Sequence, residues 1–245
     1  MREHCKHCLA SLEAPTRRQV MTGTAALLAA SAFPLGRAKA ETDAIVTPQN
    51  VIPPSEALER LMKGNARYAA NQPAERDFSY GRAARAASQY PIVAVLSCAD
   101  SRVAPELMFD QSPGDVFVVR LAGNFLNVDG FASLEYAVKV LGAPLVMVLG
   151  HTNCGAIDAA IKVVKERIEL PGHLPELIKS IEPAVIAAHA RHPSDMLAAA
   201  TEENVRLNVN RLVDDAPIMT EAIIAKKLAV AGGIYDLATG KVNLI

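Results

Sequence analysis

The pattern of apolar and polar positions divides the middle of the chain into short buried runs and longer amphipathic ones. Residues 91–98 (PIVAVLSC), 114–123 (GDVFVVRLAG) and 143–151 (APLVMVLGH) are nearly continuous apolar stretches. Such runs are typical of strands that are buried on both faces of a sheet. Residues 130–142 (GFASLEYAVKVLG) have helical spacing instead, so the pattern predicts strands that alternate with helices.

A helical pattern precedes these strands. Residues 55–72 (SEALERLMKGNARYAANQ) carry Leu58, Leu61 and Met62 at helical spacing. Ser55 has the side chain expected of an N-cap. We therefore predict a helix whose N-cap is Ser55.

The second half of the chain has mostly helical patterns and ends in strands. A helix is expected over residues 154–168, and residues 173–225 are largely helical. Breaks are expected at three prolines, Pro183, Pro193 and Pro217. Residues 228–245 predict two strands around a turn at Thr239-Gly240.

Together these patterns predict an α/β fold with a mostly parallel central β-sheet flanked by helices and an N-terminal helical arm. In such sheets, ligands bind beyond the carboxyl ends of the strands. The chain has no internal repeat and no low-complexity tract, so we expect one domain over residues 55–245. Residues 41–54 (ETDAIVTPQNVIPP) are expected to form a polar linker or arm before it.

The first forty residues have the features of a bacterial export signal. Arg17 and Arg18 precede a weakly apolar run over residues 21–35, and residues 38–40 (AKA) fit the A-x-A rule for cleavage. Paired arginines before such a run are typical of the Tat pathway, and the run is too short to span a membrane. We therefore expect a Tat-type signal peptide over residues 1–40, the Tat export machinery as a partner, and a periplasmic or otherwise exported mature protein.

Charge and composition exclude two classes of partner. The chain has 25 basic and 26 acidic residues, a formal net charge of −1. Its hydrophobic content of 51% is ordinary for a globular domain. Nucleic acids and anionic membranes attract proteins that carry a basic field. We therefore expect neither as a partner.

Cysteine usage narrows the search for a site. Cys5 and Cys8 lie upstream of the paired arginines, so we expect them to be removed with the signal peptide. The mature chain then keeps only Cys98 and Cys154, in a compartment where exposed thiols tend to oxidise. These two could be buried apolar side chains, could form a disulfide, or could be held as thiolates by a metal.

The metal alternative is supported by position. Cys98 lies at the end of one expected strand, and the motif His151-x-x-Cys154 lies at the end of another. Two thiolates and one imidazole make a plausible tetrahedral Zn²⁺ site with its fourth position undecided. Asp100 and Arg102 follow Cys98 closely, and they form either a functional pair at this site or a structural ion pair.

Four stretches of the sequence resemble a known family. They are residues 97–124 (SCADSRVAPELMFDQSPGDVFVVRLAGN), 133–157 (SLEYAVKVLGAPLVMVLGHTNCGAI), 203–205 (ENV) and 232–242 (GGIYDLATGKV). They closely resemble the β-class carbonic anhydrases, and the likeness runs from about Ser55 to the C-terminus. The resemblance implies reversible zinc-dependent hydration of carbon dioxide to bicarbonate and a proton. It also implies one Zn²⁺ per chain with Cys98, His151 and Cys154 as ligands.

The resemblance implies a role for the acid and base beside Cys98. Asp100 and Arg102 match the family's catalytic dyad, in which the aspartate either accepts a hydrogen bond from zinc-bound water or itself occupies the fourth position. In the branch whose aspartate binds zinc under bicarbonate control, a tryptophan stands at the position of Val95, and this chain has no tryptophan. We therefore expect Asp100 to pair with Arg102. Ala99 replaces a serine of the family's pattern, which changes a neighbour and no ligand.

Four further positions match the substrate pocket of the plant-like branch. Gln89 matches a glutamine that donates a hydrogen bond to the substrate, Phe117 and Tyr136 match aromatic pocket residues, and Gly155 matches a glycine whose backbone lies close to the site. In the family the site lies at a dimer interface. The resemblance therefore implies a homodimer or a dimer-based oligomer, in which Gln89, Phe117 and Tyr136 could reach the partner's metal and the N-terminal arm could wrap the neighbouring subunit.

Two other functions are compatible with the same residues. Relatives on this scaffold hydrolyse carbonyl sulfide or carbon disulfide with the same ligands, and only the access route to the metal differs. A non-catalytic zinc protein or thiol sensor would also keep the ligands, but it would be expected to lack part of the dyad or pocket. We expect CO₂ or bicarbonate as the small-molecule substrate.

Overall fold

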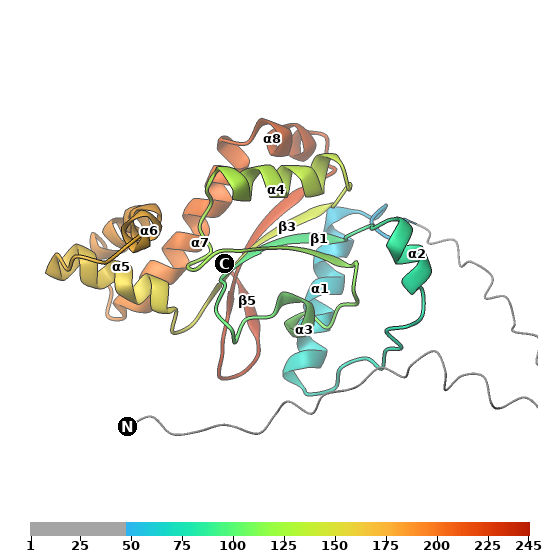
Figure 1. Ribbon diagram of the computed structural model, residues 1–245, viewed down its shortest axis with the longest axis horizontal. Coiled ribbons are helices and arrows are strands. Elements are labelled where there is room, and N and C mark those ends of the chain that lie inside the picture. Colours follow the sequence, from blue (N-terminus) through green and yellow to red (C-terminus); the bar gives the residue numbers. More distant parts are fainter. Residues whose placement is uncertain (1–47) are drawn as a thin grey trace, which may run out of the picture. The chain divides into compact units, whose positions relative to one another are not determined.

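The structure is a computed structural model that describes residues 48–245 of the chain (Figure 1). The expected signal peptide, Cys5, Cys8 and the first part of the expected linker lie outside the described residues. At the start of the described part, Gln49 donates to the Tyr90 carbonyl and to the Asp115 carboxylate, and Asn50 donates to the Leu141 carbonyl. The end of the expected linker is therefore bound to the domain.

A five-stranded sheet forms the centre of the domain, in the order β2-β1-β3-β4-β5. The strands are β1 (Val93–Ser97), β2 (Val116–Arg120), β3 (Leu145–His151), β4 (Ala229–Tyr235) and β5 (Val242–Leu244). The first four are parallel to their neighbours, and β5 runs antiparallel to β4. The predicted α/β fold and the two C-terminal strands around a turn at Thr239-Gly240 are confirmed.

Eight helices connect and cover these strands in the described part of the chain. They are α1 (Pro54–Ala69), α2 (Arg82–Ala87), α3 (Pro105–Met108), α4 (Val128–Lys139), α5 (Gly155–Glu166), α6 (Leu174–His189), α7 (Met196–Asp214) and α8 (Pro217–Ile224). None of the described helices is long and apolar enough to cross a membrane. The short helices α2 and α3 have no periodic pattern in the sequence, and neither was expected.

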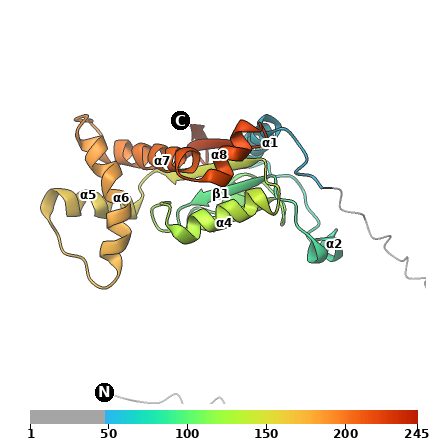
Figure 2. The same cartoon turned by 90° about the horizontal axis from the view of Figure 1, so that it is seen from above.

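The helices form a layer on each face of the sheet (Figures 1 and 2). One face packs on α1 and α3, and the other on α4, α7 and α8. The side chains of β1 alternate between these two cores, with Val93 and Val95 on the first face and Ala94 and Leu96 on the second. Because both faces are covered, β1 and β3 are buried along their whole length, which is why their sequences lack polar alternation.

A third core lies beyond the carboxyl ends of the strands. Helices α5 and α6 pack against each other and against α7. Their apolar side chains surround Cys98 and Cys154. This core therefore packs around the ends of β1 and β3, where the candidate ligands Cys98 and Cys154 lie.

Three local expectations are wrong. Strand β2 is only partly buried, because it is the edge strand of the sheet. Pro183 lies inside α6, where its buried neighbours Ile181 and Val185 hold the helix in place despite the missing N–H. Helix α1 begins at Pro54 and not after Ser55, because proline suits the first helical position, where its N–H is not needed.

Candidate metal centre

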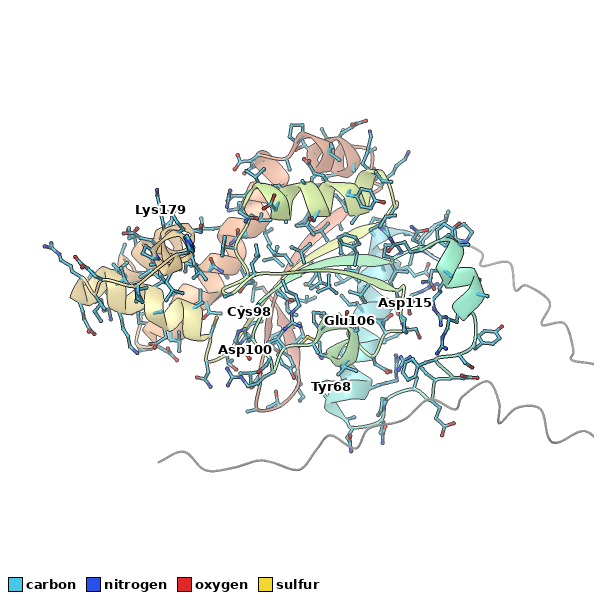
Figure 3. The ribbon with its side chains drawn as sticks, in the orientation of Figure 1. Tyr68, Cys98, Asp100, Glu106, Asp115 and Lys179 are labelled. Atoms are coloured by element: carbon cyan, nitrogen blue, oxygen red, sulfur yellow. The ribbon has the colours of Figure 1, made fainter. Side chains whose placement is uncertain are left out.

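The candidate ligands come together because parallel strands end at the same edge of a sheet. Cys98 follows β1 directly, and His151 is the last residue of the neighbouring strand β3. Cys154 is the N-cap of α5, which begins after a short turn. Figure 3 shows Cys98 and Asp100 at this edge, on the segment that leaves β1.

The three side chains form a buried cluster. Cys98, His151 and Cys154 are 3%, 0% and 1% exposed, and their candidate ligand atoms all lie within 4.8 Å of one another. It is the one group of three such ligands in the part of the chain that the structure describes. The two sulfurs are 4.0 Å apart and both cysteines are free, so the structure does not contain the disulfide that the sequence left open.

The histidine is oriented to offer one nitrogen to a cation. His151 Nδ1 lies 2.9 Å from the Thr152 carbonyl, to which its N–H donates. Its Nε2 is buried and has no hydrogen-bond partner among the described residues. A buried imidazole nitrogen without a partner is costly, and a metal ligand needs a free lone pair of this kind. The donor set therefore fits a zinc ion bound by one nitrogen and two sulfurs.

The surroundings of Cys98 favour a thiolate. Against the effect of burial, the pKa of Cys98 is lowered to about 4, first by its hydrogen bond with Cys154 and then by His151 and the N–H groups of Gly123 and Asp100. These N–H groups lie 3.2 and 3.4 Å from the Cys98 sulfur. Cys154 supplies the shared proton, so its own pKa is raised. A divalent cation between the two sulfurs would take the place of this proton.

Asp100 lies beside the cluster in a fixed orientation. Arg102 donates to its carboxylate from Nε at 2.9 Å and from Nη2 at 2.7 Å, and the Arg102 N–H donates to the same carboxylate at 2.9 Å. These hydrogen bonds hold the pKa of Asp100 below its usual range. One carboxylate oxygen lies 3.9 Å from His151 Nε2. The expected pairing of Asp100 with Arg102 is therefore present, with the ionised carboxylate facing the candidate ligands.

The remaining predicted residues lie elsewhere in the chain. Gln89 is exposed and precedes β1, so that strand, about 16 Å long at the usual rise, separates it from Cys98. Phe117 on β2 contacts Tyr136 on α4, with their ring centres 6.3 Å apart. Gly155 begins α5 directly after Cys154, and a Cβ added to it would meet no atom within 4 Å. Within one chain, the first three therefore do not join the candidate ligands.

Two residues that the sequence did not single out hold the loop after β1. Arg120, at the end of β2, donates to the carbonyls of Cys98 and Asp100 at 3.2 and 2.7 Å. Gly123 supplies the N–H that contacts the Cys98 sulfur. Both lie in a stretch that resembles the family, but no spacing rule marks a backbone amide or a distant arginine as part of a metal site.

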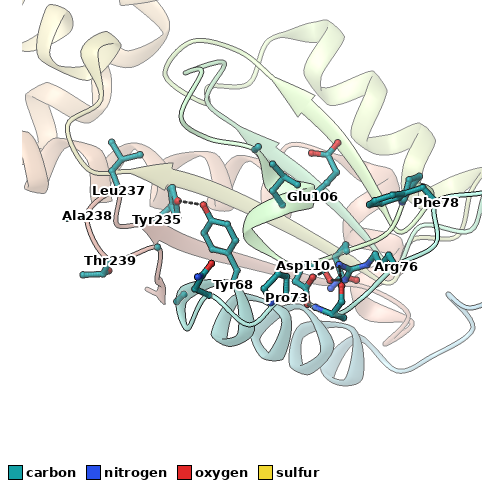
Figure 4. A pocket seen from close by; sticks show the side chains of 18 residues that line it. Tyr68, Pro73, Arg76, Phe78, Glu106, Asp110, Tyr235, Leu237, Ala238 and Thr239 are labelled. Atoms are coloured by element: carbon teal, nitrogen blue, oxygen red, sulfur yellow. Dashed lines mark hydrogen bonds and ion pairs between the residues drawn. The ribbon is translucent and has the colours of Figure 1, made fainter.

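A separate cavity of about 1030 Å³ lies between α1, α3 and the β4–β5 turn (Figure 4). At one end the hydroxyls of Tyr68 and Tyr235 are 3.3 Å apart, and burial and this hydrogen bond raise the pKa of Tyr235. Arg76 and Asp110 form an ion pair at the other end. None of the three candidate ligands lines this cavity, so it is not part of the candidate metal centre.

Both a family model and individual relatives match this chain to the carbonic anhydrases. A family model described as carbonic anhydrase matches residues 93–242. Carbonic anhydrase 2 of Mycobacterium tuberculosis is 35% identical over 192 residues, which cover 78% of this chain and 92% of the relative. The carbonic anhydrase of Mycolicibacterium smegmatis is 34% identical over 192 residues, which cover 78% and 93%.

Solved structures agree with the sequence relatives. A Coccomyxa β-carbonic anhydrase in complex with acetazolamide is 29% identical, covers 78% of this chain and 85% of its own, and has a TM-score of 0.60. One of two tetrameric β-carbonic anhydrases from Sordaria macrospora is 24% identical, covers 78% and 95%, and has a TM-score of 0.63, which supports the fold.

Proposed function

The chain belongs to the β-class carbonic anhydrases, and from this membership we propose how its residues carry out the reversible hydration of carbon dioxide to bicarbonate and a proton. Cys98, His151 and Cys154 would hold one zinc ion. The observation that carries this assignment is the buried, unpartnered Nε2 of His151 in a cluster with two free sulfurs. The enzyme is thus a zinc lyase with its centre at the carboxyl edge of the sheet.

Asp100 would orient the nucleophile at this centre. Zinc bound by these residues would lower the pKa of water to about 7 and so make hydroxide available at neutral pH. Two thiolates donate charge to the metal and weaken this effect, so a well-placed acceptor is a useful supplement. The ionised Asp100 carboxylate would accept a hydrogen bond from the nucleophile and so orient it towards the carbon of CO₂.

Arg102 would keep Asp100 in that role. Its two side-chain hydrogen bonds to the carboxylate compete with a nearby cation for the same oxygens. Arg102 Nη2 also donates to the Asn153 carbonyl at 3.3 Å, which ties the pair to the turn between His151 and Cys154. We propose that Asp100 stays paired with Arg102 and leaves the fourth position open, as in the plant-like branch.

A second copy of the chain would complete the substrate pocket. Gln89 and Tyr136 are exposed and Phe117 is half-buried beside the open edge of the sheet, so all three are available to a neighbour. Gln89 would donate a hydrogen bond to an oxygen of CO₂ or bicarbonate, and the two rings would form an apolar wall for the gas. Gly155 would let the substrate approach α5 closely. A homodimer or dimer-based oligomer is thus part of the proposed function.

The N-terminus would direct the enzyme out of the cytoplasm. The support is the sequence pattern of residues 1–40, with Arg17 and Arg18 before a short apolar run. The Tat pathway carries folded proteins, so zinc could be loaded before export. Changing both arginines to lysine should leave an uncleaved precursor in the cytoplasm. Mature protein found outside the cytoplasm in that variant would refute the Tat assignment.

The decisive experiment measures zinc content and CO₂ hydration on the same preparations. We expect one zinc per chain and rapid hydration for the unaltered protein, and loss of both in Cys98→Ser and in Cys154→Ser. Lys162→Ala, on the exposed face of α5, is the control and should change neither. Full zinc in either ligand variant would contradict the assignment, and faster hydrolysis of carbonyl sulfide or carbon disulfide than hydration of CO₂ would contradict the substrate.

A further inference from the structure

A buried amide on α7 is joined to a candidate zinc ligand through a single glycine. The N–H of Gly123 donates to the Cys98 sulfur at 3.2 Å. The carbonyl of Gly123 accepts from Nδ2 of Asn204 at 2.9 Å. Asn204 is 1% exposed and belongs to the short ENV stretch of the sequence, to which the proposed chemistry assigns no role. It lies 81 residues away from the glycine that it contacts.

Gly123 needs such a contact because its own backbone does not hold it. Its φ of +84° is one that side-chain-bearing residues rarely adopt. A Cβ at this position would lie 2.4 Å from Cδ1 of Ile181 and 3.2 Å from Cβ of Ala156, so a larger residue would have to displace Ile181 as well as adopt this φ. Glycine is also the residue with the most backbone freedom. The direction of its N–H therefore depends on contacts made by its neighbours.

Helix α7 is a rigid support for Asn204. A Cβ on Gly150 would lie 2.8 Å from Val205, and one on Gly232 would lie 2.9 Å from it, so the helix packs directly on the backbone of β3 and β4. Gly150 immediately precedes the candidate ligand His151. The helix that carries Asn204 is thus seated on the strand that carries that ligand.

A second amide one turn further along α7 fixes the same loop. Asn208 accepts from the Leu126 N–H at 2.9 Å, and its Nδ2 donates to the Asn204 carbonyl at 2.7 Å. The two asparagines therefore hold the loop at Gly123 and at Leu126. Of the two asparagines, only Asn204 contacts Gly123, whose N–H donates to the Cys98 sulfur.

We propose that Asn204 is a positioning residue of the metal centre, which holds the Gly123 carbonyl and so keeps the Gly123 N–H directed at the Cys98 sulfur. This role rests on the zinc site proposed above. An N–H donor at a metal-bound thiolate orients the sulfur and takes up part of its charge. Loss of such an outer contact typically lowers metal affinity about 10- to 100-fold.

The test reads the N–H···S contact directly and does not use enzyme activity. The protein is labelled with ¹⁵N-glycine and loaded with ¹¹³Cd²⁺, so that coupling across the hydrogen bond appears at the Gly123 amide. Zinc dissociation constants are measured by chelator competition on the same variants. In Asn204→Ala we expect the coupling to be lost and the zinc dissociation constant to rise about 10- to 100-fold.

Asn65 provides a matched control on α1. It is 4% exposed, and it donates to the carbonyls of Met108 and Gly240 and accepts from the Val242 N–H. Asn65→Ala should lower the melting temperature while leaving the ¹¹³Cd coupling and the zinc dissociation constant within twofold. If Asn204→Ala does not fold, Asn204→Ser is measured in the same way.

Three results would overturn the proposal. The first is an unaltered protein that binds ¹¹³Cd²⁺ without coupling at Gly123. The second is an Asn204 variant that keeps both the coupling and the zinc affinity within twofold of the unaltered protein, which would make Asn204 purely structural. The third is an unaltered protein that binds neither cadmium nor zinc, which would overturn the metal site itself and this role with it.

Discussion

Replacing Asp110 by asparagine tests the ion cluster that joins the segment after α1 to the end of α3. The Asp110 side chain is 1% exposed and accepts from Arg67 Nε at 2.5 Å and from the Ala74 N–H at 3.1 Å. Arg76 donates both to this carboxylate and to the Asp110 carbonyl. The φ of Asp110 is +48°, a conformation that asparagine tolerates, so Asp110→Asn removes the charge without adding backbone strain.

The expected loss of stability follows from the exposure of the two arginines. Removing one partner of a fully buried ion pair costs about 3–5 kcal/mol. The Arg67 side chain is 42% exposed and can turn to water, whereas that of Arg76 is 19% exposed and keeps fewer alternatives. Because asparagine still accepts one hydrogen bond, we expect a loss of about 2–3 kcal/mol in the free energy of unfolding. For a chain of this size that corresponds to about 5–10 °C in melting temperature.

The pH dependence of this loss has a definite sign. Burial alone would raise the pKa of Asp110, but hydrogen bonds from Arg76, Arg67 and the Ala74 N–H lower it below its usual value. A lowered folded-state pKa contributes stability that is complete above the unfolded value of about 3.9 and is lost as the pH falls through the folded value. The difference between the unaltered protein and Asp110→Asn should therefore be constant from pH 7 to about 5 and shrink below about pH 4.

Thermal unfolding followed by circular dichroism at several pH values measures this difference. Asp158→Asn is the control, because Asp158 forms an exposed i,i+4 pair with Lys162 and its loss should cost less than about 0.5 kcal/mol. A loss no larger than that of the control at pH 7, or a difference that grows as the pH falls, would show that the cluster does not act as a buried ion pair.

Three further predictions test packing and chemistry. Gly64→Ala would place a Cβ 1.8 Å from the Phe109 carbonyl oxygen. Although alanine adds about 1 kcal/mol of helix propensity, we expect the free energy of unfolding in urea to fall by at least about 1–2 kcal/mol. An unchanged midpoint would contradict this. Arg102→Lys loses the bidentate hydrogen bonds to Asp100, so the rate of CO₂ hydration should fall about 10-fold or more at unchanged zinc content. Full activity would show that the bidentate contact is not needed. Removing zinc with a chelator should lower the melting temperature, because the buried donor atoms of Cys98, His151 and Cys154 lose their partner. An unchanged melting temperature after verified loss of zinc would contradict metal binding at this cluster.

The sequence alone was sufficient for the parts of the fold that depend on neighbours along the chain. Strands β1 and β3 were predicted because a strand covered on both faces has no polar alternation, and the helices from α4 to α7 because apolar side chains recur at their own period. The meeting of Cys98 with His151 also followed, because the carboxyl ends of adjacent parallel strands lie at one edge. The chemistry of two thiols and an imidazole then indicated zinc.

Tertiary structure decided whatever depends on segments far apart in the sequence. The half-burial of β2 follows from its place at the sheet edge, which its apolar sequence does not reveal. Pro183 is tolerated because packing of α6 outweighs the lost hydrogen bond. Tyr136 lies away from its own chain's ligands because α4 packs against the edge strand β2, which spacing along the sequence could not indicate.

The hydrogen bonds around the ligands were beyond the sequence for the same reason. The contact from Asn204 to Gly123 spans 81 residues, and it exists only because α7 packs on glycines of β3 and β4. The free Nε2 of His151 depends on where the Thr152 carbonyl points. Residue types and short spacings determined which atoms could bind a metal. The packing of helices on the sheet determined how those atoms are held, because hydrogen-bond geometry depends on groups that lie far apart along the chain.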